Sequence, residues 1–457
     1  MDFYSTVAAI STPQYPGGIA VIRISGEDAF DIADKVFKSV SGVPLSNCDG
    51  YTVHFGHAYI SNSISDTVLA TVFRAPKSYT GENVVELSCH GGVYLSKQLL
   101  QALYEAGATP AENGEFTKRA FLNGKLDLTE AEAVMDMISA ESNTALAMAS
   151  KQLSGALSEK ISSAKGAIVS VLAEITAFVD FPDEDAVTLT AESLIDELTQ
   201  VEKILSKLIS TFDDGAVLRN GVNTVLCGKP NVGKSTLMNL LSGSEKSIVT
   251  DIPGTTRDIV EETVRVGEIL LKLADTAGIR DTDDTVEAIG VKRAVDRISD
   301  ARLVIGIFDS SRPADVNDKM LIDAVKKSGG SSIAVLNKTD LPTELDSEFI
   351  LGAFDRIVYL SAINGSGIDE LASAVNELML TDTSNVGEAA ISARHLSLVK
   401  KAHTHTQYAK QALESGMPLD MSTSDLSLAA DALAEITGEL ITEEILDEVF
   451  SKFCVGK

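Results

Sequence analysis

Apolar and polar positions change their spacing several times along this chain, and each spacing predicts a different kind of structure. Over residues 1–120, short alternating apolar runs are separated by glycine pairs and by helical stretches. The predicted strands are Ile19–Ser25, Thr52–Ile60, Thr67–Phe73 and Val84–Cys89. This pattern predicts an α+β domain in the first part of the chain.

From Asp127 onward the apolar spacing becomes helical. Thr129 and Glu132 have the spacing of a capping box. Apolar residues from Leu146 to Phe178 then recur every three or four positions, which predicts one long helix with a single apolar stripe.

A second helix is predicted over Leu194–Phe212, and helical periodicity returns between Leu396 and Phe453. These helical blocks flank a middle section whose strand-like runs end in polar motifs. Because each apolar stripe must be covered, we expect one discontinuous helical domain that carries the middle section as an insertion. Two unconnected helical domains are the alternative. The expected fold class is therefore multidomain α+β and α/β, with an N-terminal domain over 1–120, a helical domain over 121–215 and 381–457, and an inserted domain over 216–380.

The inserted section opens with a phosphate-binding loop. Gly228-x-x-x-x-Gly233-Lys234-Ser235 follows the strand-like run Val222–Leu226. The glycines let backbone N–H groups close around a β-phosphate, the lysine places a charge at the β/γ oxygens, and the serine hydroxyl can ligate Mg²⁺. The nucleotide-binding residues predicted here are Asn231, Val232, Gly233, Lys234, Ser235 and Thr236.

Further motifs end later apolar runs and select the base. Asp275-Thr276-Ala277-Gly278 places a carboxylate where a nucleotide-bound Mg²⁺ needs one. In Asn337-Lys338-Thr339-Asp340, the carboxylate of Asp340 can accept two hydrogen bonds from guanine, whereas adenine offers no such pair of donors. Ser361-Ala362-Ile363 can present a backbone N–H to the guanine carbonyl. This order of motifs predicts a Ras-like P-loop GTPase domain that binds GTP and Mg²⁺.

Composition limits the remaining function classes. The 457 residues include 38 basic and 66 acidic side chains, a net charge of −28, which argues against coating nucleic acid through bulk electrostatics. The best local candidate for a nucleic-acid contact is the basic stretch Arg394–Lys410, with a solvated helix face as the alternative.

The sequence has no pattern of a signal peptide, and its most apolar stretch, Ala164–Phe181, is interrupted by charged residues. Its cysteines and histidines have neither disulfide nor zinc-ligand spacing. We therefore expect a cytoplasmic protein without membrane contact.

Hydrolysis needs groups that the motifs above do not supply. In Ras-type GTPases a glutamine after the D-x-x-G glycine orients the attacking water, but this chain has Ile279 there. The segment Arg280–Glu287 contains the nearest polar candidates. Positive charge is also needed between the β- and γ-phosphates, and Asn231 with oxygens of Thr250–Thr256 can hold K⁺ in place of an arginine finger.

These motifs, with others outside the inserted section, resemble those of the MnmE (TrmE) family of tRNA modification GTPases. The additional motifs are Ser78-Tyr-Thr-Gly-Glu-Asn83, Gly114-Glu-Phe-Thr117, Ala120-Phe-Leu-Asn-Gly-Lys-Leu-Asp127 and Cys454-Val-Gly-Lys457. The resemblance spans the whole chain. It implies that GTP hydrolysis and an FAD-containing partner, MnmG, support addition of an aminomethyl or carboxymethylaminomethyl group at C5 of the wobble uridine, position 34, of certain tRNAs.

The resemblance also implies roles for residues of the nucleotide site. Glu287 would be the catalytic carboxylate that positions water indirectly, and Lys234 and Arg280 complete the candidate catalytic residues. The implied Mg²⁺ ligands are Ser235 and Thr256. The implied K⁺ ligands are Asn231, Thr250, Ile252 and Thr255. The segment expected to contact the nucleotide consists of Thr250, Asp251, Ile252, Pro253, Gly254, Thr255 and Thr256.

A tetrahydrofolate derivative, either 5-formyl- or methylene-tetrahydrofolate, is the implied one-carbon donor. The implied folate-binding residues are Arg23, Glu86, Lys125 and Lys457. Arg23 lies in an apolar strand, where a charge is costly unless paired, so it either bridges to an acid within the fold or faces an anionic ligand. Cys454 is a candidate for the one-carbon chemistry, with a small buried thiol as the alternative.

The resemblance implies a homodimer joined through the N-terminal domains, which assembles with MnmG into a heterotetramer or larger complex and acts on tRNA. A rival interpretation is a ribosome-assembly or regulatory switch GTPase, which is a binding module that makes no product. A membrane-remodelling GTPase of the dynamin type is disfavoured because the sequence has no hydrophobic tip and no basic membrane patch.

Overall fold

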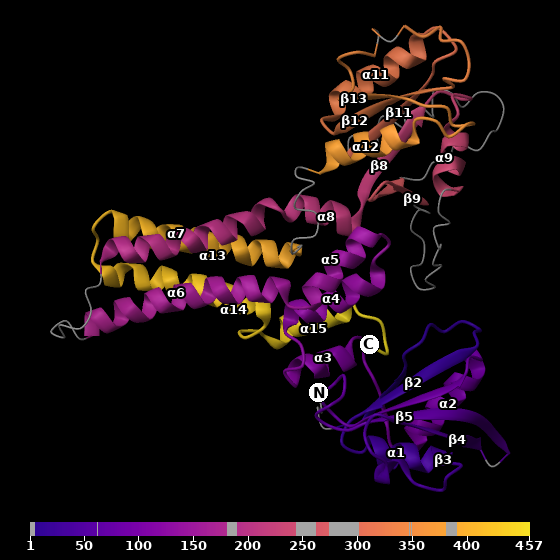
Figure 1. Cartoon of the computed structure of the whole chain (residues 1–457), viewed down its shortest axis with the longest axis vertical. Coiled ribbons are helices and arrows are strands. Elements are labelled where there is room, and N and C mark those ends of the chain that lie inside the picture. The colour runs from indigo at the N-terminus through magenta and orange to yellow at the C-terminus, as the bar shows by residue number, and fades with distance from the viewer. Residues whose placement is uncertain are drawn as a thin grey trace. The chain divides into compact units, whose positions relative to one another are not determined.

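The computed structural model describes residues 5–61, 63–180, 190–243, 262–273, 301–346, 348, 350–380 and 391–457 (Figure 1). The chain divides into two compact units. Unit 1 consists of Met1–Met135, Gln152–Glu202 and Lys401–Lys457, and unit 2 consists of Asp136–Lys151 and Lys203–Lys400.

Unit 1 contains a seven-stranded sheet in the order β3-β4-β5-β6-β2-β1-β7. Its strands are β1 (Val7–Ile10), β2 (Ile19–Ser25), β3 (Phe37–Ser39), β4 (Thr52–Ser61), β5 (Ile64–Phe73), β6 (Val84–His90) and β7 (Thr109–Pro110). The strands predicted from alternation are confirmed, although β5 begins earlier than predicted, at Ile64. The N-terminal α+β prediction is therefore correct.

The two faces of this sheet differ. One face packs against α1 (Ala29–Val36) and α2 (Val93–Ala106) through a common apolar core. Because side chains alternate along a strand, the other face carries a different set, which includes the exposed Val53, Phe55 and Leu69. Phe55 and Leu69 are direct cross-strand partners.

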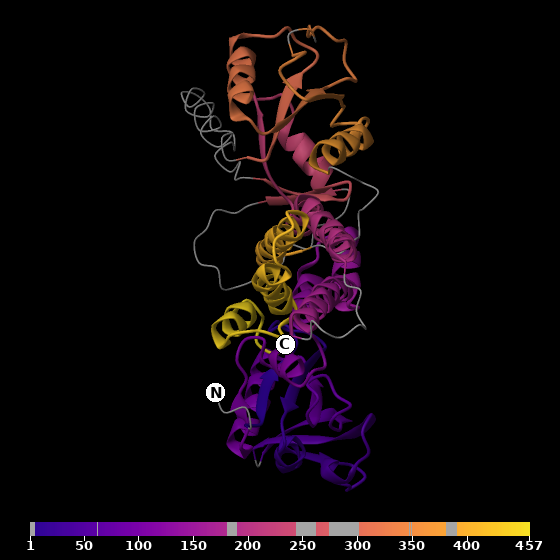
Figure 2. The same ribbon diagram turned by 90° about the vertical axis from the view of Figure 1, so that its left-hand side faces the viewer.

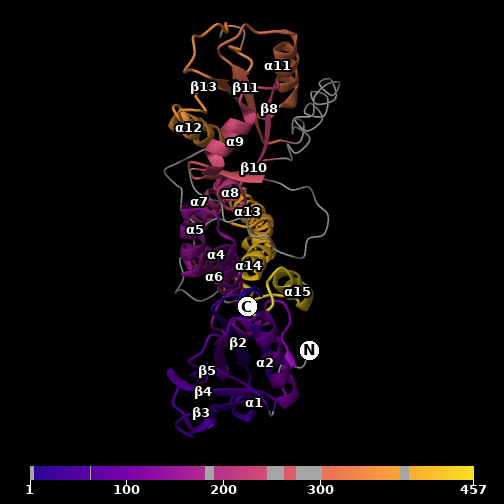
Figure 3. The same cartoon turned by 90° about the vertical axis from the view of Figure 1, so that its right-hand side faces the viewer.

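Helices from both sides of the inserted section pack together in unit 1. The helix α6 (Ala156–Asp180) lies along α14 (Thr423–Thr437), as Figures 1 and 3 both show. Lys410 of α13 (Ala393–Glu414) forms an ion pair of 2.6 Å with Glu202 of α7 (Ala191–Ser210). The predicted discontinuous helical domain is confirmed.

Among the described residues, one helix, α6, is long and apolar enough to cross a membrane by length and composition. Its apolar stripe, from Leu157 to Ile175, is buried inside unit 1, where α14 covers part of it. Only 28% of its most apolar stretch is buried, so α6 packs through one stripe, as an amphipathic helix does.

Some local predictions are wrong. The stripe from Leu146 to Phe178 is divided between α5 (Asn143–Leu153) and α6, because Gly155 takes a left-handed φ of +87° between them. The capping box of α4 (Leu128–Ser139) is formed by Asp127 and Glu130, whose side chains each accept the other's backbone N–H at 2.9 Å, rather than by Thr129 and Glu132.

The last helix, α15 (Glu443–Ser451), packs on α3 (Glu115–Leu122) and α4 through Leu446, Phe450 and neighbouring apolar residues. The residues after α15 continue onto the N-terminal part of unit 1 (Figure 2). Asn113 and Val455 form an antiparallel bridge, and the N–H of Phe116 donates to the carbonyl of Lys457 at 3.1 Å.

Unit 2 contains a six-stranded sheet in the order β13-β12-β11-β8-β10-β9, which is parallel except for β9. Its strands are β8 (Val222–Gly228), β9 (Glu262–Val266), β10 (Ile269–Leu273), β11 (Leu303–Asp309), β12 (Ser331–Asn337) and β13 (Arg356–Tyr359). Its helices include α8 (Phe212–Asn220), α9 (Lys234–Gly243), α11 (Val316–Ser328) and α12 (Ile368–Met379).

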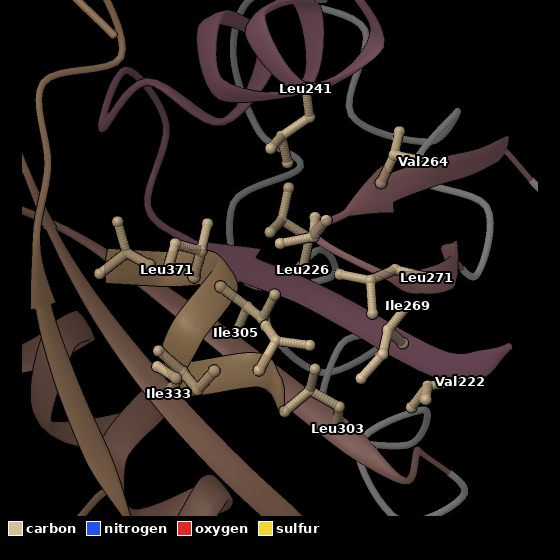
Figure 4. Close-up of a cluster of buried hydrophobic side chains, with 14 of the residues drawn as sticks. Val222, Leu226, Leu241, Val264, Ile269, Leu271, Leu303, Ile305, Ile333 and Leu371 are labelled. Atoms are coloured by element: carbon tan, nitrogen blue, oxygen red, sulfur yellow. The ribbon is translucent and has the colours of Figure 1, made fainter. Parts of the chain in front are cut away.

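Both faces of this sheet are covered, which explains why its strands are continuous apolar runs. Leu241 of α9 and Leu371 of α12 pack on one face, against Leu226, Ile305 and their neighbours (Figure 4). The opposite face packs against α11 through Val304 and Phe308. The predicted α/β inserted domain is confirmed, and its parallel strands bring their carboxyl ends to one edge.

Candidate functional site

The phosphate-binding loop joins β8 to α9 in unit 2. Gly233 has a φ of +100°, and a Cβ atom there would lie 2.1 Å from Nδ2 of Asn337. No other residue fits this position without displacing Asn337, so the glycine of the motif is required by packing as well as by backbone conformation.

Lys234 lies at the start of α9, and its ammonium group donates to the carbonyls of Gly228 and Lys229, both at 2.7 Å. The ammonium is thus held over the loop, where phosphate oxygens can take up its hydrogen bonds. Ser235 and Thr236 follow in the first helical turn and are exposed, and the backbone N–H groups of a helix start favour anions.

The amide side chain of Asn337 connects the loops of the site. Its Nδ2 donates to the carbonyl of Val232 at 2.8 Å, and its Oδ1 accepts the N–H of Ala362 at 2.9 Å. Asn337 is only 2% exposed. The phosphate loop and the loop after β13 are therefore tied to the end of β12 by one buried group.

The remaining base-binding candidates lie next to this bridge. Asp340 accepts a hydrogen bond from the hydroxyl of Ser361 at 2.6 Å, which orients its carboxylate. Lys338 has a left-handed φ of +67° and forms an ion pair of 2.6 Å with Asp309. Ile363 is exposed beside them. The structure thus brings together the predicted residues 231–236, 337–340 and 361–363.

The thiol next to the phosphate loop is not reactive in this setting. Cys227 is fully enclosed at the end of β8, and burial raises its pKa to about 12. The thiol therefore remains protonated at neutral pH and acts as a small apolar group.

The chemistry of the donors fits the ions that the motifs predict. The hydroxyl of Ser235 is exposed at the start of α9, as a Mg²⁺ ligand requires. Asn231 is exposed with a φ of +64°, and its amide oxygen is a neutral donor suited to a monovalent cation. Among the described residues, no cluster of three or more His, Cys, Asp or Glu side chains could hold a metal ion.

Part of the predicted site lies outside the described residues. These positions are Thr250, Asp251, Ile252, Pro253, Gly254, Thr255, Thr256, Asp275, Thr276, Ala277, Gly278, Ile279, Arg280 and Glu287.

A second group of predicted residues meets in unit 1, on the sheet face that α1 and α2 leave uncovered. Arg23 of β2 and Glu86 of β6 are cross-strand partners, and Nε and Nη2 of the arginine donate to one carboxylate oxygen at 2.9 and 2.8 Å. The guanidinium also lies 5.3 Å from the ring of Tyr79 and 5.4 Å from the ring of Phe116. Arg23 therefore bridges to an acid within the fold.

The other folate candidates contact segments that carry neighbours of this pair. The carbonyl of Lys457 accepts the N–H of Phe116, whose ring lies against the guanidinium of Arg23. The ammonium of Lys125 donates to the carbonyl of Pro76 at 3.1 Å, in the loop that carries Tyr79. Cys454 is exposed rather than a small buried thiol, and its carbonyl accepts the N–H of Gly114 at 3.3 Å.

Residues that sequence reasoning missed support this group. Arg119, which is 3% exposed, forms ion pairs with Glu115 at 2.7 Å and with Glu82 at 3.2 Å. The hydroxyl of Tyr79 lies 2.9 Å from the hydroxyl of Thr117, and burial raises the pKa of this tyrosine. The partners Tyr79, Glu82, Glu115 and Thr117 fall within the N-terminal sequence motifs, so motif membership was the signal that could have found them, whereas Arg119 lies between two of these motifs.

Family models and relatives agree on one family for this chain. A model of the MnmE helical domain matches residues 128–454, and a model of the GTP-binding protein TrmE N-terminus matches residues 6–125. The chain is 43% identical to the tRNA modification GTPase MnmE of Streptococcus thermophilus and 42% identical to that of Lactiplantibacillus plantarum, over 99% of both proteins in each case. The solved G domain of the Thermotoga maritima FeoB iron transporter is 24% identical, with a TM-score of 0.26, and covers 34% of this chain and 98% of its own.

Replacing Asn337 tests the bridge. We expect Asn337→Ala to weaken GDP binding by about 100-fold, because two loops lose their common buried partner and two backbone groups are left unpaired. Fluorescent GDP titration measures this. The control is Asn364→Ala, which changes an exposed asparagine in the same loop region; equal affinity of both variants and the wild type would contradict the role of Asn337.

Proposed function

The chain belongs to the MnmE family of GTPases, and on that premise we propose that it uses GTP hydrolysis to drive modification of the wobble uridine of certain tRNAs. The product carries an aminomethyl or carboxymethylaminomethyl group at C5 of uridine 34. The proposal rests on one observation: similarity extends over 99% of relatives that are named tRNA modification GTPases.

In the nucleotide site, the proposed residues have separable tasks. The phosphate loop with Lys234 binds the β- and γ-phosphates, and Ser235 ligates Mg²⁺ together with Thr256. Asp340, oriented by Ser361, accepts the donors of guanine, and Asn337 fixes the backbone of Ala362 in the neighbouring loop. These groups position GTP without supplying the group that activates water.

Water activation and charge neutralisation are assigned to residues 250–287 together with Asn231 of the phosphate loop. Glu287 positions the attacking water through an intermediate water, and Arg280 belongs to the same catalytic segment. Asn231, Thr250, Ile252 and Thr255 hold K⁺, which supplies positive charge beside the transferring phosphoryl group. The exposed amide of Asn231 supports this assignment.

The Arg23–Glu86 pair is the proposed site for a tetrahydrofolate derivative, either 5-formyl- or methylene-tetrahydrofolate. Glu86 matches the donor edge of a pterin, while Arg23, Lys125 and Lys457 suit the anionic glutamyl tail. The ring of Tyr79, which is 36% exposed, adds a stacking surface. Cys454, which is exposed and lies in the same C-terminal motif as Lys457, is the proposed residue for the one-carbon chemistry.

The exposed apolar face of the unit 1 sheet is proposed to bind a second copy of this chain. Val53, Phe55, Tyr59 and Leu69 are between 45% and 58% exposed on neighbouring strands β4 and β5. Contiguous apolar side chains of this kind favour a protein interface. The same face carries the Arg23–Glu86 pair, so a homodimer would enclose the folate site.

The wider assembly is proposed from the resemblance to the family. The homodimer acts in the cytoplasm with the FAD-containing MnmG, as a heterotetramer or larger complex that binds tRNA. The proposed domains are 1–120 for folate binding and dimerisation, 121–215 with 381–457 for the helical domain, and 216–380 for GTP hydrolysis.

Analysis of tRNA nucleosides tests the proposed activity. In cells that lack this protein, mass spectrometry should find the wobble uridine without its C5 substituent, and the wild-type gene should restore it. Complementation with Lys97→Met, a change on the exposed face of α2, should restore it equally. Normal nucleosides together with a ribosome-assembly defect would favour the switch GTPase instead.

Cation dependence tests the hydrolytic mechanism. We expect GTP turnover to be faster in K⁺ than in Na⁺ by about tenfold or more at matched ionic strength, because K⁺ replaces the charge of an arginine finger. Asn231→Ala should abolish the difference. Glu287→Ala should lower turnover by about 100-fold with unchanged GDP affinity. Equal rates in the two cations would refute the cation assignment.

Folate binding tests the second site. Calorimetry with 5-formyl-tetrahydrofolate should show binding to the wild type and a loss of about tenfold or more in affinity for Arg23→Met, because a charge-assisted hydrogen bond is removed. Lys97→Met is the matched control for loss of an exposed charge. A wild-type affinity for the Arg23 variant would remove this residue from the site.

A further inference from the structure

The connection between β11 and α11, residues 309–318, contacts both nucleotide-binding loops of unit 2. Asp309, at its start, is paired with Lys338 of the base-binding loop. Asp315 and Asp318, at its end, are paired with Lys229 of the phosphate loop at 2.8 and 2.7 Å. None of these acids belongs to a motif that the nucleotide site has used so far.

The carboxylate of Asp309 is oriented by its neighbours so that it binds a cationic side chain. It is 8% exposed, and one carboxylate oxygen accepts the N–H and the hydroxyl of Ser311 at 3.0 and 2.6 Å. This leaves the second oxygen for the ammonium of Lys338 at 2.6 Å, with Arg312 at 3.8 Å. Burial disfavours the charged carboxylate, but the hydrogen bonds from Lys338 and Ser311 outweigh it and lower the pKa of Asp309.

Lys338 is consequently fixed at both ends. Its backbone takes a left-handed conformation, with its carbonyl accepting the N–H of Leu341 at 3.0 Å, and its ammonium is fixed by Asp309. The methylene stem lies between these two fixed points, in the segment that also carries the base-binding candidate Asp340. Such a stem is an apolar surface on which a purine ring can lie.

Lys229 is held in a similar way at the other end of the connection. Asp315 caps α11 and forms a capping box with Asp318, so both carboxylates are fixed by the helix start. Burial opposes the charge on Lys229, yet its hydrogen bonds to these two acids raise its pKa. The carbonyl of the same lysine accepts a hydrogen bond from Lys234.

We propose that residues 309–318 brace the nucleotide site, with Asp309 as a positioning residue that fixes the stem of Lys338 against guanine and with Asp315 and Asp318 fixing the phosphate loop through Lys229. This inference rests on guanine-nucleotide binding by the site described above. Asp309 acts through Lys338 and touches neither the phosphates nor the reacting atoms. Its contribution therefore concerns the base alone.

Competition against fluorescent GDP on the full-length protein separates the base from the phosphates. Asp309→Asn keeps the shape of the side chain and its turn with Ser311 but removes the charge. We expect it to weaken GDP and free guanosine by the same factor, about tenfold, because both ligands contain the base. Lys229→Met should weaken GDP by about fivefold and leave guanosine within about twofold of the wild type.

Matched variants distinguish a positioning role from a structural one. Asp323→Asn removes an exposed acid of α11 outside residues 309–318 and should bind GDP within about twofold of the wild type. In a Lys338→Met background, Asp309→Asn should cause no further loss, because the two residues act as one unit.

Failure of the brace can be distinguished from failure of the proposed nucleotide site. The titration of the wild type with GDP tests the site, and the comparison of the variants tests the brace. The brace is overturned if Asp309→Asn binds guanosine within about twofold of the wild type. It is also overturned if the losses from Asp309→Asn and Lys338→Met add, because Asp309 would then act independently of Lys338.

Discussion

The nucleotide site depends on one buried side-chain amide. Parallel strands bring β8, β12 and β13 to a common edge, but the loops that follow them have no intrinsic reason to keep a fixed spacing. Asn337 fixes it by bonding to Val232 and to Ala362 at the same time. The absence of a side chain at Gly233 makes room for this amide. A lost bond would leave buried polar groups unpaired, which costs more than the bond itself contributes.

Much of this arrangement could be predicted from sequence. Buried strands such as Val222–Gly228 are uninterrupted apolar runs, and each polar motif follows the end of one, so fold and motif reinforce each other. Periodicity also predicted the N-terminal and helical domains, and the resemblance to one family added the roles proposed for their residues. The partners of individual charges could not be predicted in this way, because Arg23 and Glu86 are 63 residues apart and meet only through strand pairing.

Predictions from apolar periodicity were wrong at positions where a single residue determines where a helix begins or ends. The apolar stripe continues through Gly155, so its spacing gave no sign that the helix ends there and another begins. Glu130 rather than Glu132 completes the cap of α4, because Asp127 and not Thr129 is the residue at the helix start. The role of Asp309 could not be predicted from the sequence either. An aspartate at the end of a buried strand has many possible partners, and its pairing with Lys338 is evident only in the folded structure.

The docking of residues 454–457 has a consequence for how the protein is made. Asn113 bonds to Ser451 across 338 positions of sequence, and Phe116 bonds to Lys457 beside it. At about 5–20 residues per second, translation needs roughly 20 seconds to one minute to cover that interval. During this time the nascent chain exposes the edge around Gly114 without its final cover. The residues around Gly114 therefore obtain their final hydrogen-bond partners only after residues 451–457 have been synthesised.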